Sequence, residues 1–338
     1  MKAAYYIGNK TFQLEDVDPV EPAADEVRVK VAYCGICGTD LHAFHGAMDA
    51  RIGNHRVIGH EMSGTVDKVG EAVEGIEPGE AVVIRPLKPC GECPACKRGH
   101  AHICHNLKFL GMDSDGAFQQ YWTVPAYTVH KVPDGVSLQH AALIEPLAVA
   151  CHDIKRSRLA KGEDVLVIGG GPIGLLMAMV AKEAGGNVVI SEVSEHRLAV
   201  AEKLGFTTIN PVKDDVAARI FEMTADKGAD VIFEVSGSQA GIATMTDVAA
   251  TRARVVLVAI FPKKPEVDMF RFFWREIELL GARVYQPDDY DRALELIASG
   301  AIACEEMITD VQGIESINEA FNALSGNPQA MKSLIKCS

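Results

Sequence analysis

The chain has 338 residues, of which 48% are hydrophobic and 23% charged, a composition typical of a globular protein of two domains. Its formal net charge of −13 argues against the basic surface that nucleic-acid binding needs. No apolar run approaches the roughly 18 residues of a membrane span, and residues 1–8 lack the apolar core of a signal peptide. We therefore expect a cytoplasmic protein with no nucleic-acid or membrane partner.

The first half of the chain is predicted to be rich in short strands. Residues 27–31 alternate apolar and polar side chains as a half-buried strand does, and shorter apolar segments follow at 64–66 and 81–84. Glycine and proline separate these segments, which is typical of turns between strands. Two dense clusters of metal-binding residue types lie in this half, at 37–42 and at 59–61.

These two clusters predict a zinc site with an open coordination position. The thiolate of Cys37, the imidazole of His60 and one carboxylate could bind the ion and leave room for a water or substrate oxygen. The third ligand is either Glu61 or Glu145, and the other one takes part through water or by exchange. Cys34 and Cys37 also have the C-x-x-C spacing of a redox pair, but no thioredoxin-like pattern surrounds them.

A second metal site is predicted further along the chain. Its four cysteines have C-x2-C-x2-C-x7-C spacing and are Cys90, Cys93, Cys96 and Cys104. Four thiolates fill a tetrahedral zinc site and leave no position open, so this ion would be structural. A nearby histidine in place of one cysteine, or disulfides, are the alternatives. We expect the structural zinc lobe to cover about residues 88–106.

Strands and helices alternate after residue 150. The apolar run 165–168 predicts a strand buried on both faces, and a helix follows from 172 to 184. Further strands are expected at 188–190, 231–235 and 254–258, with a helix at 195–204. This alternation predicts an α/β, doubly wound parallel sheet. The final segment 331–336 could be a strand of the first domain, so we expect domains of 1–149 with 286–338, and of 150–285.

The first turn of this second domain predicts a dinucleotide site. Its G-x-G-x-x-G motif follows a buried strand and opens a helix, and comprises Gly169, Gly170, Gly171, Pro172, Ile173 and Gly174. Gly169 allows the tight turn, Gly171 the approach of a pyrophosphate, and Gly174 close packing of helix and strand. Glu192, at the end of the next strand, could accept both ribose hydroxyls of NAD. Arg197 could instead accommodate the 2′-phosphate of NADP.

With these motifs in this order, the chain resembles the zinc-dependent medium-chain dehydrogenases, in the branch with sorbitol and threonine dehydrogenases. The resemblance covers nearly the whole length and includes the segment 59–70 and Glu145-Pro146-Leu147. It implies a GroES-like catalytic domain, a Rossmann domain, an active site in the cleft between them, and a homodimer or homotetramer. In that branch a glutamate, rather than the cysteine of liver-type alcohol dehydrogenases, occupies the position of Glu145.

The resemblance also implies roles for individual residues. An enzyme of this kind binds two zinc ions per chain and transfers hydride between NAD and a secondary alcohol. Thr39 and His42 would relay the hydroxyl proton of the substrate through the nicotinamide ribose, and Asp40 would orient His60. Simpler interpretations remain open: Thr39 and Asp40 could only start a helix, His42 could be a surface histidine, and Glu61 could lie outside the coordination sphere.

The substrate is expected to be a polyol or a sugar-derived acid, with threonine as the alternative. Phe118, Arg283 and Tyr285 fall in segments that line the pocket in the family, but Val284 separates the arginine and tyrosine that polyol dehydrogenases carry side by side. The aromatic segment 270–274 is predicted to be core or subunit interface. A quinone-reductase-like relative would lack the zinc ligands, and a non-catalytic zinc- and nucleotide-binding protein would lack the relay residues.

Overall fold

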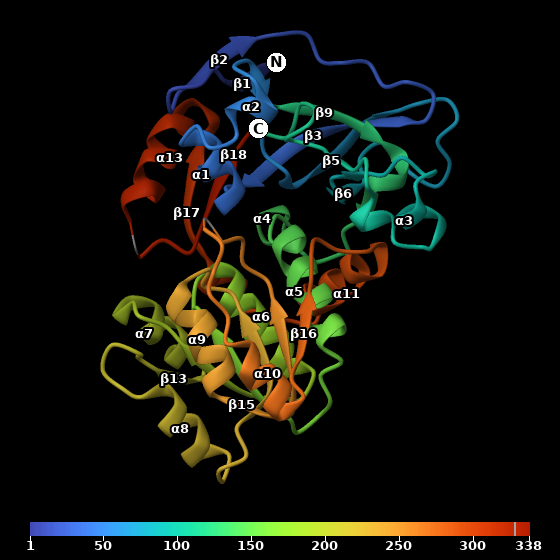
Figure 1. The fold of residues 1–338 in the computed structure, drawn as a ribbon. Coiled ribbons are helices and arrows are strands. Elements are labelled where there is room, and N and C mark those ends of the chain that lie inside the picture. Colours follow the sequence, from blue (N-terminus) through green and yellow to red (C-terminus); the bar gives the residue numbers. More distant parts are fainter. Residues whose placement is uncertain (262, 328) are drawn as a thin grey trace. The chain divides into compact units, whose positions relative to one another are not determined.

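The computed structural model describes residues 1–261, 263–327 and 329–338 (Figure 1). The chain divides into two compact units. Unit 1 comprises residues 1–146, 286–300 and 304–338, and unit 2 comprises residues 147–285 and 301–303. Among the helices of the described residues, none combines the length and apolar character that a membrane span requires.

Strand β3 (Glu26–Gly35) is the centre of the main sheet of unit 1. It pairs antiparallel with β5 (Glu61–Val69), β9 (Tyr121–Pro125) and β18 (Lys332–Lys336). The sheet has the order β10-β6-β5-β3-β18-β17, with β9 attached to β3. The valines of the predicted alternation at 27–31 all face the core and are buried. The last strand of the chain therefore lies beside one of the first.

The other elements of unit 1 are short, because glycine, proline and polar residues interrupt the apolar runs. They are β1 (Lys2–Tyr6), β2 (Phe12–Asp16), α1 (Gly38–Phe44), α2 (Asp49–Ile52), β4 (Arg56–Val57), β6 (Ala81–Ile84), β7 (Leu87–Lys88), α3 (Pro94–Lys97), η1 (Ala101–Ile103), β8 (Lys108–Phe109), η2 (Ala126–Thr128), β10 (Val129–Lys131), α4 (Leu138–Ala141), α11 (Pro287–Ala298), α12 (Cys304–Met307), β17 (Ile308–Gly313), η3 (Ile314–Ser316) and α13 (Ile317–Gly326). Helix α5 (Ile144–Ser157) begins in unit 1 and continues into unit 2.

An aromatic cluster forms part of the core of unit 1. Phe12 stacks on Phe44 with ring centroids 5.9 Å apart and contacts Phe321 at 4.7 Å. Phe118 meets the same cluster edge-on. These rings come from β2, α1, α13 and the segment before β9, so they fasten α1 to the body of the unit.

Unit 2 is a six-stranded parallel sheet with helices packed on it (Figure 1). The order β13-β12-β11-β14-β15-β16 is that of a Rossmann fold, with the reversal of strand order beside β11. The expected doubly wound sheet is thus confirmed. Its elements are β11 (Asp164–Ile168), α6 (Pro172–Glu183), β12 (Asn187–Ser191), α7 (Glu195–Lys203), β13 (Thr207–Ile209), α8 (Val216–Met223), β14 (Ala229–Glu234), α9 (Gln239–Asp247), β15 (Ala249–Leu257), α10 (Met269–Arg275) and β16 (Glu278–Gly281).

The turn between β11 and α6 depends on glycine at two positions. Gly169 has φ of +106°, a conformation that costs other residues free energy. A Cβ atom on Gly174 would lie 1.8 Å from the carbonyl oxygen of Gly169. Only a residue without a side chain lets the first turn of α6 approach the strand so closely.

Candidate active site

Cys37 is placed by the start of helix α1, directly after β3. Its Sγ accepts a hydrogen bond from the backbone N–H of Thr39 at 3.4 Å. Its own N–H donates to the carboxylate of Asp40 at 2.9 Å, which completes a capping box. The same local sequence therefore starts the helix and fixes the Cys37 thiol at the N-terminus of that helix.

His60 directly precedes β5, and its ring faces the carboxylate of Asp40. The side chain is buried, and its Nδ1 is 3.6 Å from Asp40 Oδ1, which is too long for a hydrogen bond. Burial alone would lower the pKa of His60, but the facing Asp40 carboxylate and the Cys37 sulfur outweigh it and hold the pKa well above its usual value. Because Asp40 faces Nδ1, Nε2 is the nitrogen that a metal ion could take.

Cys37, His60 and Glu61 form one compact donor set. A sulfur, a nitrogen and a carboxylate oxygen of these residues all lie within 4.8 Å of one another. Among the described residues, the buried Glu61 Oε2 of this set accepts no hydrogen bond, as expected where a metal ion completes the arrangement. One thiolate, one imidazole and one carboxylate suit zinc and leave its fourth position open, so the residues fit such an ion.

Glu145 lies close to this set without belonging to it. It is buried in the first turn of α5 and interacts electrostatically with Lys332, which also faces Glu61 and Cys37. Within the described part of the chain, the group of mutually close donor atoms contains Glu61 and not Glu145.

The sequence reasoning missed Lys332, a buried lysine on β18. Its Nζ forms an ion pair with the carboxylate of Glu61 and donates a hydrogen bond to the carbonyl oxygen of Ile36 at 3.2 Å. Burial disfavours the ammonium, but Glu61 and Cys37 outweigh this effect and raise its pKa. The only signal in the sequence is a lysine inside the short strand 331–336, and such a residue is ordinarily expected to face solvent.

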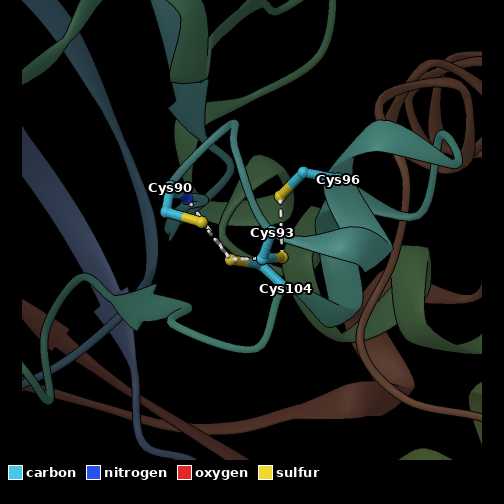
Figure 2. Close-up of side chains that lie close together, drawn as sticks. All are labelled: Cys90, Cys93, Cys96 and Cys104. Atoms are coloured by element: carbon cyan, nitrogen blue, oxygen red, sulfur yellow. Dashed lines mark hydrogen bonds between the residues drawn. The ribbon is translucent and has the colours of Figure 1, made fainter.

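The four lobe cysteines converge at one point (Figure 2). Their Sγ atoms are 3.4 Å apart for Cys90 and Cys104, 3.5 Å for Cys93 and Cys96, and 3.8 Å for Cys93 and Cys104. Four sulfurs about 2.3 Å from a tetrahedral zinc ion lie about 3.8 Å from one another. The sulfur set therefore fits a closed site.

Backbone N–H groups point at these sulfurs. The N–H groups of Cys96 and His105 lower the pKa of Cys93 to about 6, whereas burial and the neighbouring thiols raise the pKa of Cys96 to about 12. The lobe thus holds one thiolate readily, and the remaining thiol protons would be released to solvent when a cation binds.

The two residues expected to relay a proton lie on one side of α1. Thr39 is half-buried in its first turn, and His42 is exposed one turn later. Residues three apart on a helix are neighbours, so the hydroxyl and the imidazole share a face.

In unit 2 the glycine loop and Glu192 meet. Gly171 is the N-cap of α6 and brings no capping side chain, so the first N–H groups of the helix are available to a phosphate. Pro172 and Ile173 follow in the first turn and are half-buried. The Glu192 carboxylate accepts hydrogen bonds from the N–H groups of Gly170 at 2.7 Å, and of Val193 and Ser194 at 2.8 Å.

Arg197 lies beside the same carboxylate. Its Nη1 is 3.9 Å from Glu192 Oε2, and a Cβ atom on Gly171 would be 3.5 Å from that nitrogen. The guanidinium therefore lies next to the glycine loop. In that position it could accommodate the 2′-phosphate that distinguishes NADP from NAD.

The three residues expected in the substrate pocket have different surroundings. Phe118 is fully buried and belongs to the aromatic core of unit 1. Tyr285 is buried and Arg283 is exposed. Val284 between them has φ of +50°, a strained conformation for a β-branched residue. This bend in the backbone lies between the exposed Arg283 and the buried Tyr285.

The motifs and the two units agree with comparisons to known proteins. Residues 23–134 match the model of the alcohol dehydrogenase GroES-like domain, and residues 172–299 match that of the zinc-binding dehydrogenases. A 2-dehydro-3-deoxy-L-galactonate 5-dehydrogenase from Pseudoalteromonas atlantica is 52% identical over 100% of this chain and 99% of its own length. This chain belongs to the zinc-dependent medium-chain dehydrogenase family.

Two further relatives are less similar in sequence but still match nearly the whole chain. An L-threonine 3-dehydrogenase from Pyrococcus furiosus is 35% identical over 92% of this chain and 91% of its own length. A zinc-binding dehydrogenase from Sinorhizobium meliloti, solved with NADP bound, is 32% identical and superposes with a TM-score of 0.92, over 99% of this chain and 98% of that one. Membership in the family makes the chain an oxidoreductase of the alcohol dehydrogenase type, with a GroES-like domain and a Rossmann domain as expected.

Proposed function

We propose that the chain is an NAD-dependent dehydrogenase that oxidises a secondary hydroxyl of a sugar-derived acid or polyol, using one catalytic and one structural zinc ion. The observation that carries this proposal is the compact donor set of the half-buried Cys37 and the buried His60 and Glu61. It occurs in a chain 52% identical, over its full length, to a 2-dehydro-3-deoxy-L-galactonate 5-dehydrogenase.

The catalytic ion would be held by Cys37 and His60, with Glu61 or Glu145 as the third ligand. Zinc in such a site supplies a Lewis acid that lowers the pKa of an alcohol. Asp40, 3.6 Å behind the His60 ring, would orient it so that Nε2 faces the ion. The four cysteines of residues 90–104 would hold the second ion, which shapes the lobe.

The proton of the substrate hydroxyl needs a route to water, and a bound nicotinamide would supply the hydride acceptor. The Thr39 hydroxyl, in the first turn of α1, would accept this proton while donating its own through the nicotinamide ribose to His42, whose exposed ring would release it to solvent. Thr39 and His42 lie three residues apart on α1, directly after Cys37, and this shared helix face supports the route.

NAD is the proposed cofactor. Glu192 is fixed by three backbone N–H groups and presents a negative charge that repels a 2′-phosphate. The pyrophosphate would lie on Gly169, Gly171 and Gly174 at the start of α6, with Pro172 and Ile173 in the adjoining turn. The positive charge of Arg197, beside Glu192, would partly offset this repulsion of a 2′-phosphate. Because one relative was solved with NADP bound, both cofactors should be measured.

In this proposal residues 1–149 and 286–338 form the catalytic domain, and residues 150–285 bind the cofactor. Arg283, which is exposed, is proposed to meet the substrate through a carboxylate. Phe118 and Tyr285 are both fully buried, and they are proposed to support the substrate pocket from inside the protein. We place the enzyme in the cytoplasm, where clustered thiols stay reduced and available to zinc.

The proposed enzyme is a homodimer or homotetramer. Helix α10 exposes Met269, Phe270, Phe273 and Trp274, and the adjacent edge strand β16 exposes Leu279. Exposed apolar side chains beside an unprotected sheet edge are a typical protein–protein interface.

One assay tests the proposed activity. The purified protein is given NAD or NADP with 2-dehydro-3-deoxy-L-galactonate, a panel of aldonates and polyols, or L-threonine, and hydroxyl oxidation is followed as formation of the reduced cofactor. We expect a sugar acid to give the highest kcat/KM with the NAD couple. Threonine as the single good substrate would favour the second candidate, an L-threonine 3-dehydrogenase, which the 35% identical relative supports. Metal analysis gives a separate criterion, since a non-catalytic scaffold would hold the lobe zinc alone.

A further inference from the structure

Glu234 is a buried carboxylate for which the proposed reaction has no use. It is the last residue of β14 and is fully buried. It accepts hydrogen bonds from the backbone N–H groups of Ser236 at 3.1 Å and Gly237 at 3.2 Å, and from the Ser236 hydroxyl. Burial raises the pKa of Glu234, and these hydrogen bonds offset the effect only in part. Because a buried carboxylate is costly without such bonds, it and the turn that follows hold each other in place.

The hydrogen bonds continue through this serine turn, residues 236–238, into helix α9. Ser236 Oγ lies 2.9 Å from Ser238 Oγ and accepts from the N–H of Ser238 at 3.2 Å. Ser238 Oγ accepts from the N–H of Gly241 at 2.9 Å and so caps the helix. A Cβ atom on Gly241 would collide with Glu234 Oε1 and Ser236 Oγ. The missing side chain at residue 241 therefore leaves room for the carboxylate and the serine turn.

The serine turn packs against the glycine loop of unit 2. Glu234 is paired with Ile168, the last residue of β11, in the parallel sheet. A Cβ atom on Gly169 would lie 3.1 Å from the backbone nitrogen of Ser236, so the two backbones are in close contact. Strands β11 and β14 lie on either side of the reversal in strand order, where a Rossmann fold binds its dinucleotide. The serine turn is thus placed at that crevice.

Gly169 connects the serine turn to the residue that would face the adenine ribose. Its N–H donates to the carbonyl oxygen of Ser191 at 2.8 Å, and the next residue, Gly170, donates to the Glu192 carboxylate at 2.7 Å. A carboxylate at the end of this strand accepts the ribose hydroxyls in such folds. Gly169 therefore lies between the serine turn on one side and the end of β12 on the other. A shift of the serine turn would displace the part of the loop that serves the adenosine half.

We propose that Glu234 is a positioning residue for the cofactor: through the serine turn it holds Gly169 at the spacing from Glu192 that the adenosine half requires. This inference rests on the proposed cofactor site in unit 2. Glu234 acts through the turn, because its own carboxylate is fully buried and engaged by Ser236 and Gly237. Its effect is therefore the same for the whole dinucleotide and for 5′-AMP, which contains the adenosine half alone.

The experiment compares wild type with two changes that disturb the turn in different ways. Glu234→Gln keeps the shape of the side chain but turns an amide toward the backbone N–H groups, whereas Gly241→Ala pushes on the carboxylate and removes no polar group. The double variant combines both. Glu202→Gln is the matched control, because Glu202 is an exposed glutamate of the same unit that accepts a hydrogen bond from the Thr208 hydroxyl at 2.6 Å. For each protein we measure the Kd of 5′-AMP by calorimetry, the Kd of NADH by fluorescence, and the midpoint of urea unfolding.

Glu234→Gln is expected to raise the Kd of 5′-AMP and that of NADH by the same factor of about 10, the size expected when one hydrogen bond to a charged group is lost. Gly241→Ala should raise both constants in the same proportion to each other. Because the two changes act on one turn, the double variant should resemble the weaker-binding single variant and not show the product of the two losses. Glu202→Gln should bind both ligands as wild type does.

Three results would contradict the inference alone. They are an unchanged affinity for 5′-AMP in the folded Glu234→Gln protein with only the urea midpoint lowered, a loss confined to NADH, and multiplied losses in the double variant. Should Glu234→Gln fail to fold, Gly241→Ala and Ser236→Ala decide in the same way, since Ser236→Ala removes only the hydroxyl between the carboxylate and Ser238. A wild-type protein that binds neither 5′-AMP nor NADH would instead overturn the proposed cofactor site together with this inference.

Discussion

At the scale of single residues, one short sequence serves two purposes. Cys37 and Asp40 form the capping box that begins α1, and the same carboxylate faces His60. A capping interaction is local and can be predicted from spacing, whereas its second contact depends on β5. The donors are therefore arranged partly by a helix start and partly by the sheet.

The proton route predicts different effects for Thr39 and its variants. Thr39→Ala should lower kcat by about 10²- to 10⁴-fold, the usual contribution of a positioned proton-transfer group. The circular dichroism spectrum and zinc content should stay unchanged, since the backbone N–H that contacts Cys37 remains. Thr39→Ser keeps the hydroxyl and should retain most of the activity. Comparable losses in both variants would contradict the relay.

Cofactor choice is predicted to depend on Glu192. Glu192→Ala leaves three backbone N–H groups and Arg197 facing the position of the ribose. Because a hydrogen bond to a charged group is worth about 1.5–3 kcal/mol, kcat/KM for NAD should fall about 10- to 100-fold, while that for NADP rises.

Two companion variants test this interpretation. Exposed Glu195, which pairs with Lys213, gives the control Glu195→Ala, whose preference should match wild type. Adding Arg197→Ala to Glu192→Ala should remove the gain with NADP. A gain that survives this addition would show that Arg197 does not contribute to phosphate binding.

At the scale of elements, periodicity predicted the Rossmann unit well. The apolar run at 165–168 and the alternation at 27–31 lie within β11 and β3, because burial on one or both faces leaves a direct pattern in the sequence. Proline at the start and glycine after the end predicted the helix that begins at Pro172. In the structure it ends at Glu183, one residue before the expected Ala184.

The contacts that could not be predicted join residues far apart in the chain. Lys332 meets Glu61 across 271 positions, and only the pairing of β18 with β3 brings them together. Phe118 shows a second limit of prediction from sequence. A phenylalanine in a short strand-like segment gives the same sequence pattern whether it lines a pocket or packs in the core, where Phe118 is fully buried.

The glycine at the start of α6 is predicted to be irreplaceable. Gly174→Ala places a Cβ atom 1.8 Å from the carbonyl oxygen of Gly169. Such overpacking typically costs about 1–3 kcal/mol or more, so unit 2 should unfold at lower denaturant concentration and bind NADH weakly. Gly281→Ala is the control, because no atom lies within 4 Å of its added Cβ. Thermal or urea unfolding and NADH fluorescence measure both effects.

The four-cysteine lobe should depend on its metal. Cys96→Ser is expected to release one zinc ion per chain and to make residues 90–104 sensitive to proteases, since the short helices there have little apolar core. Zinc uptake by the metal-free lobe should weaken as pH falls, because the pKa of Cys96 is raised to about 12 and its proton must leave. Cys304→Ala, a buried cysteine outside the lobe, should keep the metal content of wild type. Full zinc content in Cys96→Ser would refute the assignment.

At the scale of the whole molecule, the exposed aromatic side chains predict self-association. Trp274 is 70% and Phe273 75% exposed, far more than such side chains show on an ordinary surface. Replacing both by serine should shift the protein toward monomers in analytical ultracentrifugation. Val212→Ser, at a similarly exposed apolar residue of the same unit, should leave the mass unchanged. A monomeric wild type would contradict the proposed oligomer.

The position of Lys332 has a consequence for synthesis. A nascent chain that has just completed unit 2 already carries Cys37, His60 and Glu61, but not yet the strand with the ammonium group. Because domains fold as the chain emerges, these three donors can meet before their cation is translated. The buried carboxylate of Glu61 therefore gains its counter-charge only when the last strand of the chain has joined β3.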